Sequence, residues 1–319
     1  MHVLGIDAGG TKTICLLADA EGTVVGEARG VGANLQASGE REVEKVLHHV
    51  MDGAIGERDV RPAAICLGIA GVDRPEDTVA VHGIMQRRGF QARVIVVSDA
   101  LVALVAGVGD AAGVVVVAGT GSIAYGRDAA GRAARAGGWG YLLGDEGGGF
   151  WIGRAALTAV VRQFDGRGPA TLLTPMILEH LGLTTPNALI HEIYYRDVHR
   201  HIVAGLAGIV QRAMDERDAI AAEILDRAGG QLASAAASVI TRLEMRGEVF
   251  PTVLAGGIFR GVPWLVADVT RRLSEIAPRT HVGRLDVEPA IGAVRLALAA
   301  ARGNMPIPTY AADPKGPRS

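Results

Sequence analysis

A hairpin motif that occurs twice constrains the fold of this chain more than any other feature. Residues 10–22 and 119–131 align without a gap, and they share Gly, Thr, Asp, Ala and Gly in register. One further matched position carries Thr13 in the first copy and Ser122 in the second. Because internal repeats reflect the architecture of a chain, we predict a duplicated fold in which each half contains one of these hairpins.

The sequence around the first copy predicts a β-meander followed by alternating helices and strands. Apolar runs separated by Gly9-Gly10 and Glu21-Gly22 are typical of a three-stranded meander. Strands that alternate with helices indicate an α/β layer with parallel pairing. In chain order we expect strands at 3–6, 13–18 and 23–28, a helix from an N-cap at Ser38 to Ile55, then strand 63–69, helix 76–88, strand 93–97 and helix 100–105.

The same pattern restarts after residue 112, so we expect an α/β chain of two lobes. Its 319 residues are enough for two domains. The second half predicts strands at 114–118 and 122–126, mainly helices over 152–246, a strand at 252–254 and a last helix at 289–301. We therefore expect an N-terminal lobe at 1–112 with the C-terminal helix 289–302 packing back on it, a C-terminal lobe with a helical insertion at 113–288, and a flexible tail at 305–319.

Charge and cysteine usage exclude several classes of partner. The formal net charge of -2 gives no electrostatic reason to expect nucleic acid or a membrane surface. The N-terminus lacks the pattern of a signal peptide, and no apolar run is long enough to span a bilayer. Cys15 and Cys66 lie in apolar runs without the spacing of a zinc site or a disulfide framework. We expect two buried thiols in a cytoplasmic protein.

The loop of the first hairpin has the chemistry of a phosphate site. The preceding strand ends in Asp7, and the glycines that follow let the backbone approach a ligand. Backbone N–H groups in such a turn can cradle an anion, and Asp7 can hold Mg²⁺ directly or through water. The candidate phosphate-binding residues are Asp7, Gly9, Gly10, Thr11 and Lys12. A plain hairpin that uses its glycines for positive φ explains this loop equally well.

A second loop strengthens the phosphate interpretation. Two cradles on opposing lobes can hold a polyphosphate such as ATP from both sides. The chain has neither a Walker-type P-loop nor the dinucleotide-binding glycine pattern. Glycines between a strand and a helix near residue 256 would let an adenine or ribose lie against the backbone, although a tight turn alone would also use them. The added candidates are Gly119, Thr120, Gly121 and Ser122 in the second loop, and Gly256 and Gly257 beside the adenosine.

Three other side chains indicate a binding site for the molecule that accepts the phosphate. Asp99 follows a strand and precedes a helix, at the edge of an α/β sheet where ligands collect. A carboxylate there can act as the base in phosphoryl transfer, or it can simply cap the helix together with Ser98. Trp139 and Asp145 lie in a glycine-rich segment. A Trp ring and a carboxylate suit a sugar, and a structured surface loop is the alternative.

At these residues the chain resembles the BadF/BadG/BcrA/BcrD ATPase family. It is most similar to the N-acetylglucosamine kinase branch of the actin-like (sugar kinase/Hsp70) superfamily, from about Val3 to Ala301. The glycine-rich segment is the most specific of the matching motifs. These motifs are Asp7-Ala-Gly-Gly-Thr-Lys-Thr, Ala118-Gly-Thr-Gly-Ser, Gly138-Trp-Gly-Tyr-Leu-Leu-Gly-Asp-Glu-Gly and Leu254-Ala-Gly-Gly-Ile.

The resemblance implies a duplicated ribonuclease-H-like (actin-like ATPase) fold with ATP and Mg²⁺ in the cleft between its lobes. It implies transfer of the γ-phosphate to the 6-hydroxyl of an amino sugar, with Asp99 as the base and a homodimer as the common assembly. Thr11 and Thr120 would contact phosphates. The residues that the resemblance places at the sugar are Asn34, Gly71, Asp99, Thr120, Gly121, Trp139, Gly140 and Asp145.

Alternatives remain open for the substrate and for the activity. Mammalian relatives have Ser-Leu-Ser-Gly where this chain has Gly68-Ile69-Ala70-Gly71, so a hydroxyl that could contact the acetamido sugar is missing. N-acetylglucosamine, glucosamine and N-acetylmuramate all fit. The alternative activity is that of an ATPase that activates a partner enzyme, which needs thiolates for an iron–sulfur cluster at a subunit interface. A third possibility is a nucleotide-binding protein without catalysis, against which the retained Asp99 argues.

Overall fold

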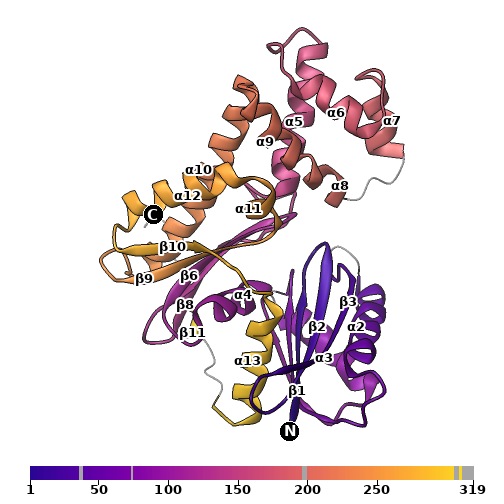
Figure 1. Cartoon of the computed structure of the whole chain (residues 1–319), viewed down its shortest axis with the longest axis vertical. Coiled ribbons are helices and arrows are strands. Elements are labelled where there is room, and N and C mark those ends of the chain that lie inside the picture. The colour runs from indigo at the N-terminus through magenta and orange to yellow at the C-terminus, as the bar shows by residue number, and fades with distance from the viewer. Residues whose placement is uncertain (36–38, 73–74, 196–199, 305–308, 311–319) are drawn as a thin grey trace, which may run out of the picture.

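The computed structural model describes residues 1–35, 39–72, 75–195, 200–304 and 309–310. Within them, two β-sheets form the framework of two lobes, as Figure 1 shows. The first sheet has the order β3-β2-β1-β4-β5, and the second has the order β10-β9-β6-β7-β8-β11.

The first sheet combines an antiparallel meander with two parallel strands. Strand β1 pairs antiparallel with β2, which pairs antiparallel with β3. On its other side β1 pairs parallel with β4, and β4 pairs parallel with β5. The strands are β1 (His2–Ala8), β2 (Lys12–Ala18), β3 (Val24–Val31), β4 (Pro62–Ile69) and β5 (Arg93–Val97).

The second sheet repeats this topology and adds one further strand, β11, beside β8. Strand β6 pairs antiparallel with β7 and parallel with β9, while β7 pairs antiparallel with β8 and β9 pairs parallel with β10. The predicted duplication of an α/β fold is therefore confirmed. The strands are β6 (Gly113–Ala118), β7 (Ser122–Arg127), β8 (Arg132–Gly137), β9 (Phe250–Ala255), β10 (Thr280–Arg284) and β11 (Thr309–Tyr310).

The repeated aspartate makes the same turn in both hairpins. Asp19 Oδ1 accepts hydrogen bonds from the backbone N–H groups of Glu21 and Thr23, at 3.0 and 2.8 Å. In the second copy, Asp128 Oδ1 accepts from the backbone two and four residues ahead at the same two distances. Such side-chain to backbone bonds fix a turn locally. The sequence repeat is thus a repeat of hairpin chemistry.

Two helices lie between the two sheets and form a core that both lobes share. Helix α4 (Asp99–Val108) and helix α13 (Ala290–Ala301) pack on each other and against β1 and β4. Their buried cluster includes Val3 from the first sheet, Val115 and Val253 from the second, and Leu104 from α4. Since α4 is apolar on nearly all sides, it is suited to a layer that is covered from both directions.

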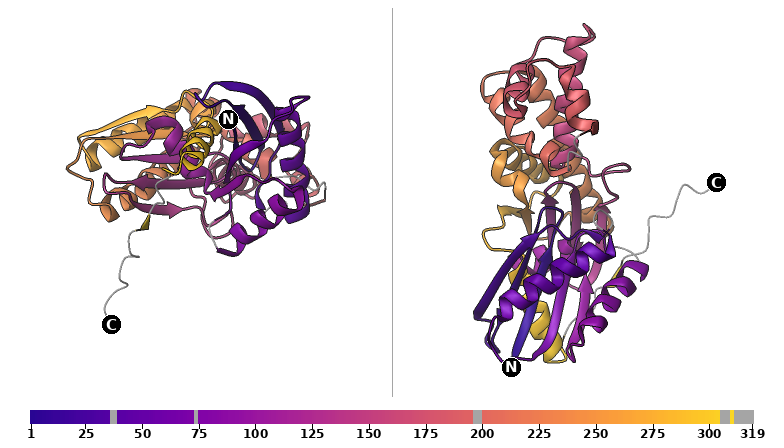
Figure 2. Two further views of the ribbon diagram at one scale, coloured as in Figure 1. Left: turned by 90° about the horizontal axis from the view of Figure 1, so that it is seen from below. Right: turned by 90° about the vertical axis from the view of Figure 1, so that its right-hand side faces the viewer.

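The remaining helices cover the outer faces of the sheets or form an insertion. Helices α2 (Glu40–Ile55) and α3 (Pro75–Arg88) pack on the outer face of the first sheet. The outer face of the second sheet packs against α10 (Ala219–Arg242), α11 (Gly257–Gly261) and α12 (Pro263–Ile276). Figure 2 shows the insertion at the end of the molecule away from the N-terminus. It contains α5 (Gly149–Phe164), α6 (Leu173–Leu181), α7 (Ala188–Tyr195), α8 (Arg200–Gly205) and α9 (Ala207–Asp215).

The structure differs from the sequence-based expectation at three places. Helix α2 begins at Glu40 with Gly39 as its N-cap, and Ser38 lies outside the described residues. Strand β10 was not predicted. In the segment 305–319, expected to be a flexible tail, Thr309 and Tyr310 form β11 against β8, and the other residues lie outside the described part. Every helix in that described part is too short or too polar to cross a lipid bilayer.

Candidate functional site

The two repeated loops touch each other across the lobes. Thr11 Oγ1 lies 3.0 Å from Thr120 Oγ1, within hydrogen-bond distance. The two threonines occupy equivalent positions of the sequence repeat, 109 residues apart. A β-carbon added to Gly10 would lie 4.0 Å from the Thr120 side chain. The duplicated fold thus brings both predicted phosphate loops to one place, each loop presenting a hydroxyl.

The first loop is held by backbone hydrogen bonds. The N–H of Gly9 donates to the carbonyl of Lys12 at 3.0 Å, and the N–H of Ala33 donates to the carbonyl of Gly9 at 3.1 Å. The N–H of Ala70 donates to Ala8 O at 2.9 Å. These bonds draw the segments after β3 and β4 against the loop. They carry Asn34 and Gly71, two predicted sugar-binding positions, to the same edge of the first sheet.

Asp7 is a buried carboxylate under this loop. Its side chain lies on β1, and the residue is only 8% exposed. Burial, and to a lesser degree the nearby charge of Asp99, raise its pKa from an ordinary 3.8 to about 7, while the charge of Lys12 opposes this rise. Asp7 and Asp99 are therefore close enough to repel each other. This is a site where a cation would relieve the cost of two neighbouring carboxylates.

Lys12, a predicted phosphate ligand, is paired with a carboxylate that the sequence analysis did not identify. Its Nζ donates to Glu288 Oε2 at 2.8 Å, and Arg29 also contacts Glu288 at 3.3 Å. Burial opposes ionisation of Glu288, but the hydrogen bond and charge of Lys12, with the charge of Arg29, hold its pKa below the ordinary value. Glu288 precedes α13, so this pair ties the first loop to the C-terminal helix.

Asp99 is the first residue of α4, at the carboxyl end of β5. Ser98 is the N-cap, and its Oγ accepts a hydrogen bond from the N–H of Ala100 at 3.1 Å. The capping role that the sequence left open for both residues therefore belongs to Ser98. Asp99 is half-buried, and a carboxylate in the first helical turn is stabilised by the helix dipole.

The second loop is braced by the glycine-rich segment that follows β8. Ser122 Oγ donates to the carbonyl of Glu146 at 2.7 Å. The N–H groups of Gly149 and Phe150 donate to the carbonyls of Gly119 and Thr120, at 2.8 and 2.9 Å. Ser122 is a predicted phosphate ligand, but in this structure its hydroxyl donates its proton to the carbonyl of Glu146. The first residues of α5 thus hold the second loop in place.

Asp145 lies directly against the second loop. A β-carbon added to Gly121 would be 2.3 Å from Asp145 Oδ2, so only glycine allows this approach. Asp145 has a φ of 59°, an unusual backbone conformation for a residue other than glycine. Burial raises the pKa of Asp145, while hydrogen bonds from the backbone of Ser122 and Gly140 and the charge of Arg200 lower it. Its carboxylate links Gly140 to the loop.

Aromatic rings beside Asp145 carry arginines on their faces. Trp139 is 62% exposed, and the Arg135 guanidinium lies 5.0 Å from its ring centroid. The Arg200 guanidinium lies 4.8 Å from the Tyr141 centroid. Trp139 is therefore a surface side chain rather than a core one. Neither arginine was identified from the sequence, because each is recognisable only through the fold that brings it to the ring.

Gly256 and Gly257 join β9 to α11 next to β6. Gly256 has a φ of 107°, and a β-carbon there would lie 2.2 Å from Ala118 O. A tight turn therefore requires this glycine. Positions Gly257 and Gly119, by contrast, have nothing within 4 Å of an added β-carbon. Each leaves open space beside the backbone, which a flat ligand could approach.

No group of three or more His, Cys, Asp or Glu side chains arranged to hold a metal ion occurs among the described residues. This does not conflict with Mg²⁺ at Asp7, because protein-bound Mg²⁺ commonly uses one or two carboxylates together with water and substrate phosphates.

A family model and related sequences match nearly the whole chain. The model of the BadF/BadG/BcrA/BcrD ATPase family matches residues 4–297. An N-acetylmuramic acid/N-acetylglucosamine kinase of Clostridium acetobutylicum is 34% identical over 93% of this chain and 98% of its own length. An N-acetyl-D-glucosamine kinase of Dictyostelium discoideum is 32% identical over 92% of this chain and 97% of its own length.

Solved structures share the same two-lobed fold. A protein of Chromobacterium violaceum, provisionally named N-acetylglucosamine kinase, superposes with a TM-score of 0.73 and 25% identity, covering 93% of this chain and 98% of that one. A ROK family glucokinase of Streptomyces griseus superposes with a TM-score of 0.64 and 16% identity, covering 95% of this chain and 100% of that one. The second likeness concerns the fold alone. Together they confirm the predicted fold of an actin-like sugar kinase.

Proposed function

The chain belongs to the BadF/BadG/BcrA/BcrD ATPase family, and from this we propose that it is an ATP-dependent kinase of an amino sugar. The relatives named above act on N-acetylmuramic acid and N-acetylglucosamine. We further propose that the γ-phosphate passes to the sugar 6-hydroxyl. The observation that carries this proposal is the contact of Thr11 with Thr120. The loop of Thr11 follows Asp7, a buried carboxylate whose pKa the charge of Asp99 raises.

Asp99 is proposed as the base. In-line attack needs the acceptor hydroxyl near the γ-phosphate and a carboxylate within hydrogen-bond reach of its proton. Since Ser98 supplies the helix cap, Asp99 is not needed for that purpose. Its position at the carboxyl end of β5 is where substrates bind in α/β sheets. Asp99 would accept the proton of the sugar hydroxyl as the phosphoryl group is transferred.

The two loops are proposed to hold the phosphates of ATP. The hydroxyls of Thr11 and Thr120 now share one hydrogen bond, and each would donate to phosphate oxygens when a nucleotide enters. Gly9, Gly10, Gly119 and Gly121 let the loop backbones come close to these oxygens. Lys12 would contribute positive charge while remaining anchored by Glu288. Gly256 and Gly257 would border the adenosine.

Asp7 is proposed as the residue that holds Mg²⁺, directly or through water. A buried carboxylate whose pKa is raised by burial and by Asp99 is a site short of positive charge, and hard oxygen donors are what Mg²⁺ prefers. When bound, the ion would neutralise charge on the β- and γ-phosphates. The protein contributes the fixed position of Asp7 on a buried strand.

The sugar is proposed to lie between the first-sheet edge and the glycine-rich segment. Asn34 and Gly71 would contact it from one side, and Trp139, Gly140 and Asp145 from the other. Thr120 and Gly121 would lie at the junction with the phosphates. N-acetylglucosamine is the first candidate acceptor. Glucosamine and N-acetylmuramate are the others, because Ala70 lacks the serine hydroxyl expected of the mammalian kinases that the chain resembles.

An ADP-release assay over a panel of amino sugars and hexoses tests the proposal. We expect release to depend on an amino sugar and on Mg²⁺. Phosphorus-31 and carbon-13 NMR of the product should show a phosphate ester on carbon 6. ADP release that no sugar stimulates would contradict the kinase function. An ester on another carbon would contradict only the proposed position of transfer.

The alternative activity, activation of a partner enzyme, lacks the thiols it requires. Cys15 and Cys66 are both fully buried within strands, and burial raises the pKa of each thiol. Such thiols are poor ligands for a cluster shared across a surface. A cytoplasmic location and a homodimer remain part of the proposal, the first supported by the two reduced cysteines.

A further inference from the structure

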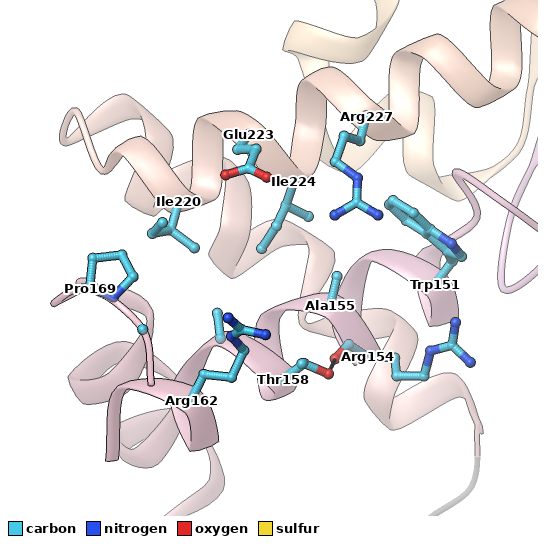
Figure 3. Close-up of a pocket in the computed structure, with 12 residues that line it drawn as sticks. Trp151, Arg154, Ala155, Thr158, Arg162, Pro169, Ile220, Glu223, Ile224 and Arg227 are labelled. Atoms are coloured by element: carbon cyan, nitrogen blue, oxygen red, sulfur yellow. Dashed lines mark hydrogen bonds between the residues drawn. The ribbon is translucent and has the colours of Figure 1, made fainter. Parts of the chain in front are cut away.

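A pocket lies on the second lobe between α5 and α10, lined by residues that have no part in the proposed kinase site. Its volume is about 470 Å³, within the range of about 300–1,000 Å³ that is typical of small-molecule sites. Figure 3 shows Trp151 at one end and Pro169 at the other. Ala155 and Ile224 contribute apolar surface between them.

Positive charge dominates the lining. Arg154 and Arg162 come from α5 and Arg227 comes from α10, against one carboxylate, Glu223. Figure 3 shows Arg162 and Arg227 extending toward the space between the two helices. Arg162 donates to the carbonyl of Arg167 at 3.3 Å. Within the described part of the chain, none of the three arginines forms an ion pair with a carboxylate.

Trp151 and Arg227 form a preorganised end of the pocket. The Arg227 guanidinium lies 5.4 Å from the Trp151 ring centroid, in a cation–π contact that links α10 to α5. Stacking of this kind leaves the planar donors at the guanidinium edge able to bind an anion. Arg162 likewise keeps donors beyond the one that contacts Arg167. Two guanidinium groups can thus act on one ligand while apolar residues contact its carbon skeleton.

We propose that this pocket is a second ligand site, separate from the kinase cleft, that binds a phosphate-bearing metabolite of about hexose size. Arginine forks match the oxygens of a phosphate group. The apolar floor suits the carbon face of a sugar ring, and Glu223 can accept hydrogen bonds from hydroxyl or amino groups. The shared chemistry is the phosphate, which either a sugar phosphate or inorganic phosphate could provide.

Occupancy of this pocket would act on the kinase site through α5. The N–H groups of Gly149 and Phe150, in the first turn of α5, hold the carbonyls of Gly119 and Thr120 in the second loop. Trp151 is the next residue, and it lines the pocket. A ligand that fixes Trp151 against α10 therefore fixes the helix end that braces this loop. This regulatory effect rests on the proposed function, whereas binding itself does not.

Calorimetric titration of the full chain tests binding without relying on activity. The probes are N-acetylglucosamine 6-phosphate and inorganic phosphate, each added to wild type, Arg162→Gln, Arg227→Gln and the control Arg41→Gln. Arg41 is exposed on α2 of the other lobe. Loss of either pocket arginine should weaken one binding event about tenfold or more, as expected for a lost charge-assisted hydrogen bond, and Arg41→Gln should leave it unchanged.

A variant that is expected to bind phosphate more tightly shows that the arginine variants do not act by a simple loss of structure. Glu223→Gln removes the negative charge and should strengthen binding of inorganic phosphate in the same titration. Stronger binding of the sugar phosphate than of phosphate would identify the sugar phosphate as the source. Equal binding would identify inorganic phosphate. The proposal is overturned if wild type and both pocket variants bind both probes identically.

Kinase assays then separate regulation from binding. At saturating amino sugar, where competition by the sugar phosphate for the acceptor site is suppressed, added ligand should change the rate in wild type and in Arg41→Gln, and should not change it in Arg227→Gln. Absence of any sugar-dependent rate would contradict the proposed function while the titration result stands. Binding that leaves the wild-type rate unchanged would overturn the regulatory effect.

Discussion

At the scale of single residues, the buried carboxylate of Asp7 lowers the free energy of unfolding. In the folded chain its pKa is about 7, because burial and the charge of Asp99 disfavour ionisation, whereas its ordinary value is 3.8. Between these values the unfolded chain has lost a proton that the folded chain keeps. The free energy of unfolding therefore falls as the pH rises through this window, by at most about 4 kcal/mol. Above pH 7 the full cost is present.

We therefore predict that Asp7→Asn stabilises the ligand-free protein, and more so at pH 8 than at pH 4. The amide has a similar shape and no charge to bury. Urea unfolding of both proteins at pH 4, 6 and 8 measures the difference. The same difference at all three pH values would show that the carboxyl does not titrate as described. Since Asp7 is the proposed Mg²⁺ ligand, the variant should lose kinase activity as it gains stability.

Asp99→Asn should lower kcat for sugar phosphorylation by about 10²- to 10⁴-fold, the usual loss for a general base. The KM for ATP should change little, since Asp99 is proposed to act on the acceptor hydroxyl. Ser98→Ala is the matched control: it removes the N-cap hydrogen bond, costs about 1 kcal/mol of stability, and leaves the base in place. Activity of Asp99→Asn equal to that of the control would exclude Asp99 as base.

The sequence indicated the candidate residues of this site, but it did not indicate most of the side chains that contact them. Asp7, Asp99 and the two threonines were recognisable because each follows a strand in a short motif. The pair of Lys12 with Glu288 joins residues 276 positions apart, and no local pattern reveals it. Asp145 was predicted as a sugar ligand, but its contact with Gly121 depends on a fold that local patterns do not specify.

At the scale of elements, the crossing of α4 and α13 places Asp99. The two helices approach so closely that a β-carbon on Gly292 would lie 2.0 Å from Val102 O and 2.7 Å from Ala106 N. A backbone atom cannot move aside as a side-chain tip can. The glycine therefore sets the distance between the two helices of the shared middle layer.

Gly292→Ala should destabilise the protein by about 1–3 kcal/mol, because the helices must separate. It should also lower kcat, since α4 carries Asp99 at its start. Gly208→Ala in α9 is the matched helical control: nothing lies within 4 Å of its added β-carbon, so it should stabilise by up to about 1 kcal/mol. Thermal unfolding should show a lower Tm for Gly292→Ala and a higher Tm for Gly208→Ala. Equal shifts would mean that packing at Gly292 does not limit the crossing.

Most elements were predictable, and the exceptions have physical reasons. The long amphipathic or apolar segments, such as α2 and β6, give clear periodic patterns. Strand β10 has the sequence of residues 280–284 and is largely exposed at a sheet edge, so it lacks an apolar signal. Strand β11 has only two residues, Thr309 and Tyr310, and forms because β8 offers an open edge, which the sequence of the segment does not show.

At the scale of the whole molecule, the shared middle layer joins two repeats that each have their own sheet. The buried cluster around α4 and α13 takes side chains from both sheets, so neither lobe completes its core alone. A chain of two lobes would otherwise be expected to unfold in two steps, since separate cores unfold separately. The duplication was visible in the sequence. The shared layer was not, because it depends on how the two copies face each other.

We predict that both lobes unfold together, and the chain has a natural probe in each. Its three tryptophans, at 139, 151 and 264, all belong to the second lobe, whereas both cysteines lie in strands of the first sheet. Burial raises the pKa of Cys15 and Cys66, so both thiols stay unreactive until the first sheet opens. Tryptophan fluorescence and thiol labelling in urea should give the same midpoint.

Leu104→Ala tests whether the middle layer causes this coupling. Leu104 is fully buried in the cluster that both sheets share, and its truncation should cost about 2–5 kcal/mol. Both probes should shift to lower urea by the same amount. Leu225→Ala is the companion test, because Leu225 is equally buried but lies in the outer core of the second lobe alone. If the lobes unfold together, it should also shift both probes by one common amount, whereas a shift of the tryptophan signal alone would contradict the coupling. If Leu104→Ala moved only one probe, or if the probes already differed in wild type, each lobe would hold its own core and the shared layer would not couple them.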